Sequence, residues 1–188
     1  MLDLAILGLL HDGSLHGYEL KRRLADLGSW RVSFGSLYPA LRRLERNGCI
    51  TVDRASGRRK TYSLTAAGKD YFHEMLEDHA GTDDERAFHL RMAFFRHIDP
   101  ETRIDVLESR RASLSKRLAA TRTALRAATT RARERMDRYT VALMERGVRS
   151  AEADIAWLDD LIATERSERS ANSGHQPVPA EPPEEHRP

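Results

Sequence analysis

Cysteine and aromatic residues are scarce in this sequence. Among its 188 residues there is one cysteine, and phenylalanine, tyrosine and tryptophan together make up 6%. A lone cysteine can form neither an intramolecular disulfide nor a thiolate metal site. We therefore expect Cys49 to be a small buried apolar residue, with a redox sensor as the alternative. With so few aromatics, the core is expected to be built from Leu, Ala and Ile in packed helices.

Long apolar runs are also missing. The first ten residues are apolar on nearly every side, but they are too short to span a bilayer and predict a buried helix. They also carry Asp3 where a signal peptide would have basic residues. No other segment is long enough to cross a membrane. We therefore expect a cytoplasmic protein with no membrane contact.

The residue patterns of catalytic and metal sites are absent as well. No glycine-rich phosphate loop follows a predicted strand, and no serine, histidine and acid stand at a known catalytic spacing. His73 and Glu74 are followed by His79, but this spacing puts the two imidazoles on different helix faces, unlike the pattern of zinc proteases. The sequence predicts a protein that is not an enzyme and has no cofactor and no metal.

Positive charge is concentrated between residues 42 and 60, although the net charge of the chain is only +2. Against two acids, Glu45 and Asp53, this segment holds seven cations: Arg42, Arg43, Arg46, Arg54, Arg58, Arg59 and Lys60. Such a local basic surface can bind phosphates while acids elsewhere balance the total charge. A solvated charged face is the alternative interpretation.

The charged segment begins on a short predicted helix. Its apolar side carries Leu37, Leu41 and Leu44, and the arginines point broadly away from that stripe. Ser33 or Gly35 can open the helix, and Asn47-Gly48 ends it. Pro39 is tolerable because it is expected in about the first turn.

Two short strands follow this helix, around residues 50–52 and 61–64, joined by a turn that contains Gly57. Two further helices are predicted before it, over residues 1–10 and about 15–27. The order is helix, helix, helix, hairpin. A basic helix beside a basic hairpin tip predicts a winged helix-turn-helix with a two-stranded wing.

The remainder of the chain is predicted to be helical. Thr65 can cap a helix over about 66–79, a capping box at 82–85 can start one over about 83–98, and Asp99-Pro100 starts another. From residue 101 to 146 there is no Gly or Pro, and a heptad pattern predicts a coiled-coil seam with a bend near 129–137. Gly147 is expected to end this helix, and Ser150 to cap a last one. Together these helices predict a hairpin that doubles back and pairs with another chain.

Three motifs carry a resemblance to a known family. The runs HGYELKRRL at 16–24, GSLYPALRRLE at 35–45 and GRRKTYSLTAAGK at 57–69 resemble the PadR family of bacterial transcriptional regulators. Residues 84–166 resemble the helical C-terminal domain of its longer, virulence-activator-type members. The resemblance implies a homodimeric winged-helix regulator, usually a repressor, whose C-terminal helices form the dimer interface. It identifies neither the operator nor the inducer.

These observations predict a mainly α-helical protein in three parts: a winged helix-turn-helix over 1–80, a helical coiled-coil-like dimerisation domain over 81–166, and a disordered tail over 167–188. The residues expected at double-stranded operator DNA are Ser36, Tyr38, Arg42, Arg43, Arg46, Arg58, Arg59 and Lys60. Tyr38 lies close to the apolar stripe, so a packing role is its alternative. The residues expected at the dimer interface are Phe88, Phe95, Leu107, Leu114, Leu118, Leu125 and Leu158.

The predicted function is control of transcription by a DNA-bound dimer, as a repressor that a small-molecule ligand releases from its operator. A winged helix that serves only as a protein-interaction adaptor is the alternative. The ligand is expected to be small and apolar or aromatic, held between the two domains. The bulky residues expected near that junction are Trp30, Phe34, Phe88, Phe94 and Phe95.

Overall fold

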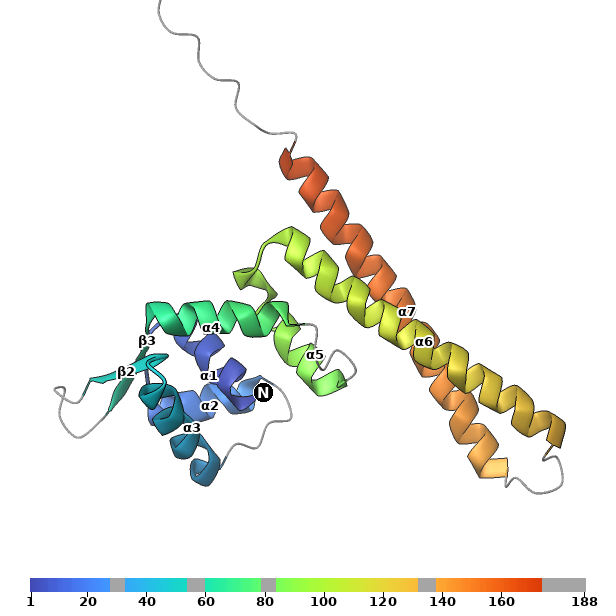
Figure 1. Ribbon diagram of the computed structural model, residues 1–188, viewed down its shortest axis with the longest axis horizontal. Coiled ribbons are helices and arrows are strands. Elements are labelled where there is room, and N and C mark those ends of the chain that lie inside the picture. The colour runs from blue at the N-terminus through green and yellow to red at the C-terminus, as the bar shows by residue number, and fades with distance from the viewer. Residues whose placement is uncertain (28–32, 54–59, 79–83, 132–137, 174–188) are drawn as a thin grey trace, which may run out of the picture.

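The computed structural model describes residues 1–27, 33–53, 60–78, 84–131 and 138–173. In chain order the elements are α1 (Leu2–His11), β1 (Leu15–His16), α2 (Gly17–Asp26), α3 (Phe34–Arg46), β2 (Ile50–Asp53), β3 (Thr61–Leu64), α4 (Ala66–Glu77), α5 (Glu85–Met92), the 3-10 helix η1 (Phe95–His97), α6 (Pro100–Arg131) and α7 (Arg138–Ser173). The first seven form a compact unit, and α6 and α7 form a long hairpin beside it (Figure 1). This confirms the predicted mainly helical winged-helix fold. Within the described ranges, no helix is long and apolar enough to cross a membrane.

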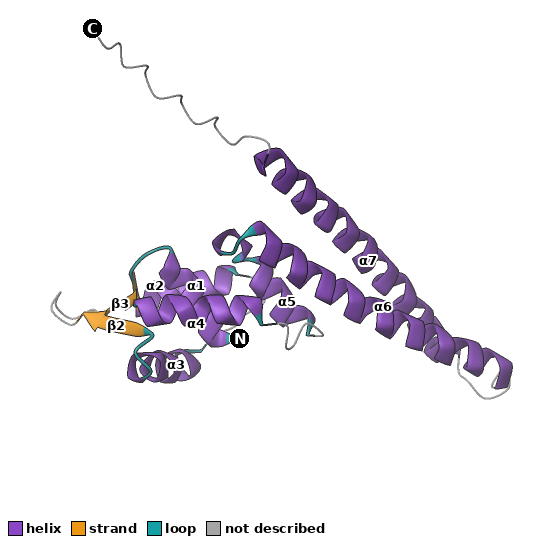
Figure 2. Cartoon of the chain, turned by 45° about the horizontal axis from the view of Figure 1, so that its top comes forward, coloured by secondary structure: helices purple, strands orange, loops and turns teal. Residues whose placement is uncertain are grey.

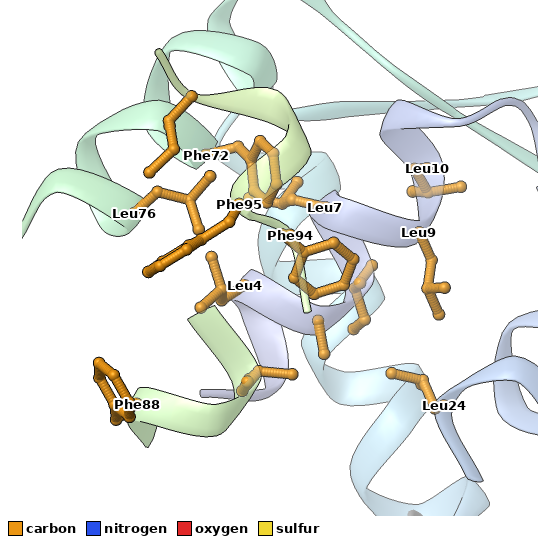
Figure 3. Packing of buried hydrophobic residues seen from close by; sticks show 14 of the residues in the cluster. Leu4, Leu7, Leu9, Leu10, Leu24, Phe72, Leu76, Phe88, Phe94 and Phe95 are labelled. Atoms are coloured by element: carbon orange, nitrogen blue, oxygen red, sulfur yellow. The ribbon is translucent and has the colours of Figure 1, made fainter. Parts of the chain in front are cut away.

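The core of the N-terminal unit is built around α1. Its residues from Leu4 to Leu10 are all buried, because α2, α3, α4 and β3 surround this helix. The apolar character of the segment on all sides predicted this burial. Figure 3 shows Leu4, Leu7, Leu9 and Leu10 of α1 packed with aromatic residues that come from α4 and from the segment after α5.

The sheet has three strands in the order β1-β3-β2, where the sequence analysis predicted a two-stranded wing. The added strand is Leu15–His16, which was predicted to be the first turn of a helix. Leu15 pairs with Tyr62 and His16 with Thr61. The buried Leu15 side chain favours pairing with the sheet over a place in the helix, and His16 Nδ1 lies 3.1 Å from Thr61 Oγ1.

The start of α3 settles which residue opens the helix. The Ser33 hydroxyl accepts a hydrogen bond from the Ser36 backbone N–H at 3.2 Å, so Ser33 is the N-cap. Pro39 is the sixth residue of α3 and lies past the first turn, so its predicted place was wrong. Its ring faces solvent, on the side opposite the buried Leu37 and Leu41.

The helix predicted over about 83–98 ends at Met92, and η1 follows it. Phe94 and Phe95 turn into the core at this break (Figure 3), and their burial outweighs the continuation of a helix. The carboxylate of Asp84 caps α5, while Thr82 and Asp83 lie outside the described residues. Asp99 caps α6 as predicted, accepting backbone N–H bonds from Glu101 and Thr102.

α6 and α7 run antiparallel in close contact over much of their length (Figures 1 and 2). The chain reversal falls on residues 132–137, outside the described residues, where the sequence analysis expected a bend. Gly147 and Ser150 lie inside α7, so the predicted helix end and the predicted cap were wrong. Burial of Leu158 and Ile162 against α6 stabilises α7 enough to tolerate an internal glycine.

Ion pairs cross the hairpin between the described parts of α6 and α7. Arg103 Nη1 lies 3.4 Å from Glu165 Oε1, and further pairs join Arg111 to Asp159, Arg122 to Glu152 and Arg166 to Glu108. α7 remains helical to Ser173, so the disordered tail predicted from residue 167 does not begin there. Residues 174–188 lie outside the described residues.

Candidate nucleic-acid interface

The helix α3 has a buried side and an exposed side. Leu37, Ala40, Leu41 and Leu44 are buried against the N-terminal core. The predicted DNA contacts Ser36, Tyr38, Arg42, Arg43 and Arg46 are all exposed. The helix therefore presents its cations to solvent on a rigid support, the arrangement that a helix needs to enter a major groove.

The arginines of α3 are not equivalent. Arg43 forms an ion pair with Asp3 at the start of α1. Among the described residues, Arg42 and Arg46 make no ion pair. Arg42 and Arg46 are thus the cations of α3 that are available for phosphates or base edges without breaking a contact.

Tyr38 takes part in packing as well as facing solvent. Its ring stacks on Phe34 with 5.8 Å between centroids, and a Cβ added at Gly17 would lie 3.3 Å from its hydroxyl oxygen. The tyrosine therefore rests on the start of α2 while 39% of its surface stays exposed. The packing interpretation of Tyr38 therefore holds in part, and its predicted contact with DNA stays a prediction.

Two residues of α2 extend this exposed surface, and the sequence analysis did not select them. Lys21 Nζ lies 3.7 Å from the centroid of the Phe34 ring, a cation–π contact. Tyr18 is 73% exposed one turn earlier on the same helix. The signal was present in the HGYELKRRL motif, which contains both residues. We call the half-buried Lys21 and the exposed residues Tyr18, Phe34, Ser36, Tyr38, Arg42 and Arg46 the α2–α3 surface.

The wing carries part of the predicted contact set. Val52 pairs with Tyr62 and Asp53 with Thr61 across the β2–β3 ladder, which projects away from the hairpin (Figure 2). Lys60 directly precedes β3 and is exposed. Arg58 and Arg59 lie outside the described residues, so their predicted role stays a prediction.

Most of the predicted dimer residues lie inside the single chain. Phe88, Phe95, Leu107, Leu114, Leu118 and Leu158 are buried, and Leu125 is half-buried. The predicted seam on α6 is covered by α7 of the same chain. The large apolar side chains left most exposed on α7 are instead Tyr139 and Leu143.

The residues expected around a ligand pocket do not gather in one place. Phe34 lies on the α2–α3 surface, Phe88, Phe94 and Phe95 are core, and Trp30 lies outside the described residues. A hollow of about 230 Å³ instead lies between α5, α6 and α7, lined in part by Phe88, Arg110 and Trp157. Arg110 is buried with its guanidinium 5.3 Å from the Phe88 ring centroid.

Sequence comparison finds relatives for both halves of the chain. Residues 6–74 match the Transcriptional regulator PadR-like family, and residues 86–165 match the family Virulence activator alpha C-term. The Negative transcriptional regulator PadR of Bacillus subtilis (strain 168) is 31% identical over 127 residues, covering 61% of this chain and 70% of the relative. An uncharacterized 37.1 kDa protein in transposon TN4556 of Streptomyces fradiae is 36% identical over 78 residues, covering 42% of this chain. The matched region spans only 21% of that relative.

Solved structures give a weaker likeness. Bacillus subtilis PadR in complex with operator DNA aligns over 87% of this chain and 97% of that chain, with 22% identity and a TM-score of 0.40. The same protein in complex with p-coumaric acid aligns over 88% and 98%, with 23% identity and a TM-score of 0.40. The family assignment rests on the sequence matches. With 31% identity over 70% of a PadR regulator, and with both halves matched, the chain belongs to the PadR-like family of transcriptional regulators, with a virulence-activator-type C-terminal region.

Proposed function

We propose that this protein is a dimeric repressor that binds double-stranded operator DNA through the α2–α3 surface and the wing. The observation that carries the proposal is the two-sided α3, with Arg42 and Arg46 exposed and four apolar residues buried. The curated PadR relative is named as a negative regulator, which supports repression over activation. A crystal structure of that relative holds operator DNA.

The first experiment finds the operator by selecting genomic fragments with the purified protein. Affinity for a selected fragment is then measured at several salt concentrations for wild type and for Arg42→Ala and Arg46→Ala. A base-reading arginine should cost about 1–3 kcal/mol, and a phosphate contact should reduce the salt slope by about one. Lys116→Ala, an exposed cation on α6, is the control and should change neither quantity.

The same titration distinguishes the adaptor alternative. A DNA-binding protein loses affinity steeply with salt because phosphate contacts release counterions. An adaptor that binds a protein through an apolar surface does not. Failure to enrich any genomic fragment, or affinities unchanged in both α3 variants, would count against the proposed function.

We propose that the second chain of the dimer packs on the outer face of α7. Tyr139 and Leu143 lie one turn apart there and are 61% and 67% exposed, while the residues of the internal seam are already buried. Light scattering should report a dimer for wild type. Leu143→Glu should shift it toward monomer, because a charge would be buried at the interface, whereas Ala163→Glu, at an exposed position near the other end of α7, is the control. A wild-type monomer at micromolar concentration would contradict dimerisation.

We propose that the hollow between α5, α6 and α7 receives a small aromatic molecule. The Phe88 and Trp157 rings offer apolar walls, and Arg110, Glu85 and Asp154 also line the hollow. The p-coumaric acid held by the Bacillus subtilis relative has this chemistry. Small aromatic molecules should raise the melting temperature of wild type but not of Trp157→Ala, and should release operator DNA. Stabilisation without release would leave a binding site but contradict its regulatory role.

A further inference from the structure

Three ligand-type side chains from distant parts of the sequence meet where the N-terminal unit joins the hairpin. His11 and Asp12 lie at the end of α1, and His97 lies at the end of η1, just before α6. One ligand atom from each of the three residues lies within 4.8 Å of the others. The His11 and His97 rings are neighbours, with 4.2 Å between centroids. We call these residues the α1–η1 triad.

The Asp12 carboxylate is arranged so that one oxygen is held and the other faces the imidazoles. Its Oδ2 pairs with Arg96, while its Oδ1 lies 3.4 Å from His97 Nε2. Two ligands bound at about 2.0–2.1 Å to a tetrahedral ion are roughly 3.4 Å apart. The distance between Asp12 Oδ1 and His97 Nε2 is therefore already that of two ligands on one ion. Arg96 orients the carboxylate by pairing with its other oxygen.

The Nε2 atom of His97 makes no hydrogen bond within the described part of the chain. The His97 side chain is only 10% exposed, and Nε2 is buried. A buried polar atom without a partner is costly, and a bound cation would satisfy it. His97 is also contacted through its backbone, because His73 Nε2 lies 3.1 Å from the His97 carbonyl oxygen.

Lys69 and Arg96 place positive charge near the His11 imidazole. The same cations repel a divalent ion, so they favour an exchangeable ion over one that is held permanently.

We propose that the α1–η1 triad binds one divalent metal ion of the kind that prefers imidazole, represented by Zn²⁺, with water completing the coordination. Two imidazoles and one carboxylate form a ligand set typical of such ions, in contrast to the all-oxygen sets of Mg²⁺ and Ca²⁺. The ion joins the end of α1 to the segment that leads into α6. It therefore stabilises the connection between the winged helix and the hairpin, whether or not DNA is bound.

The test uses the full-length chain without an affinity tag, with Co²⁺ as a spectroscopic probe and Zn²⁺ as a competitor. Wild type should bind one Co²⁺ per chain, show the visible bands of a tetrahedral site and lose them on addition of Zn²⁺. Asp12→Asn and His97→Gln should each weaken binding by about tenfold or more, a loss at least as large as for second-shell changes. His89→Gln, an exposed histidine on α5, is the matched control and should bind as wild type does.

The thermal response provides a second readout that does not depend on spectra. Zn²⁺ should raise the melting temperature of wild type and of His89→Gln, because only the folded chain holds the site. It should leave Asp12→Asn unchanged, and circular dichroism verifies that both triad variants are folded. Equal Co²⁺ affinity in wild type and Asp12→Asn, binding that follows other histidines such as His175 and His186, or no binding at all would overturn the proposal.

Discussion

Arg43 differs from its neighbours on α3 because its charge is already paired with Asp3. We expect Asp3→Asn to release Arg43 toward DNA and to remove a negative charge beside the phosphate-binding face. Operator affinity should then rise, and the salt slope should steepen by about one phosphate contact. Asp105→Asn, an exposed acid on α6, is the control for net charge. A slope unchanged in Asp3→Asn would mean that Arg43 does not reach a phosphate.

The reactivity of the Cys49 thiol tests the expectation that the lone cysteine is a structural residue. The residue is 6% exposed, and burial raises the pKa of its thiol, with the negative charge of Asp3 adding to the effect. Thiolate is the reactive form, so native protein at neutral pH should react slowly with a thiol reagent. The rate should rise to that of a free thiol in guanidinium. Rapid reaction in the native state would favour the redox-sensor alternative.

At the scale of single elements, Gly68 in the first turn of α4 marks a close contact with the wing. A Cβ built on it would lie 1.9 Å from the backbone oxygen of Cys49, which cannot move without disturbing β2. Gly68→Ala should therefore lower the free energy of unfolding by about 1–3 kcal/mol, as overpacking does. Gly147→Ala is the matched control.

The control is expected to change stability in the opposite direction. Gly147 lies inside α7 with nothing within 4 Å of an added Cβ. Alanine is favoured over glycine in a helix interior by about 1 kcal/mol, so the variant should be slightly more stable. Urea titrations of both variants give the comparison. Equal effects would mean that the contact at Gly68 relaxes without cost.

Asp99 allows a pH test of a single helix cap. Hydrogen bonds from the Thr102 side chain and backbone lower the pKa of Asp99 below its ordinary value of 3.8. A lowered folded pKa means that the cap contributes fully above about pH 3.8 and is lost as pH falls through the folded value. Asp99→Ala should cost about 1 kcal/mol at neutral pH. The difference from wild type should shrink in strong acid, and a constant difference would contradict the role of the charge.

Local signals predicted the elements better than their ends. The helix caps formed by Ser33, Thr65 and Asp99 depend on a few adjacent residues, so these residues could be named as candidate caps from the sequence alone. The strand Leu15–His16 has two residues and no readable period, so only its pairing with β3 reveals it. The passage of α7 through Gly147 likewise depends on packing against α6, which no local pattern encodes.

At the scale of the whole molecule, one candidate site could be predicted from local sequence and the other could not. Arg42 and Arg46 could be selected because charge and helical period sit together in one short segment. The α1–η1 triad could not, because Asp12 and His97 are brought together only when the segment after α5 folds back onto α1. The burial of Leu114 by α7 rather than by a second chain also follows from a long-range contact.

Phe94 links the two halves of the molecule, and its removal tests that link. Its ring stands edge-on to Phe72 of α4 at 5.7 Å and so close to α1 that a Cβ added at Gly8 would lie 2.4 Å from it (Figure 3). Phe94→Ala should leave a cavity between α1 and α4 and cost about 3–5 kcal/mol. Phe34→Ala removes the same side chain from a residue that is 42% exposed, and its cost should be much smaller.

The two phenylalanine variants are compared by urea unfolding in a Trp30→Phe background, followed with both circular dichroism and tryptophan fluorescence. Trp157 on α7 is then the sole tryptophan, so its fluorescence reports on the hairpin, whereas helix content reports on the whole chain. If Phe94 couples the halves, the two signals should coincide in wild type and in Phe34→Ala and separate in Phe94→Ala, because the winged helix then unfolds first. Coincident transitions in Phe94→Ala with a cost near that of Phe34→Ala would show that the contact between the segment after α5 and α1 does not hold the winged helix to the hairpin.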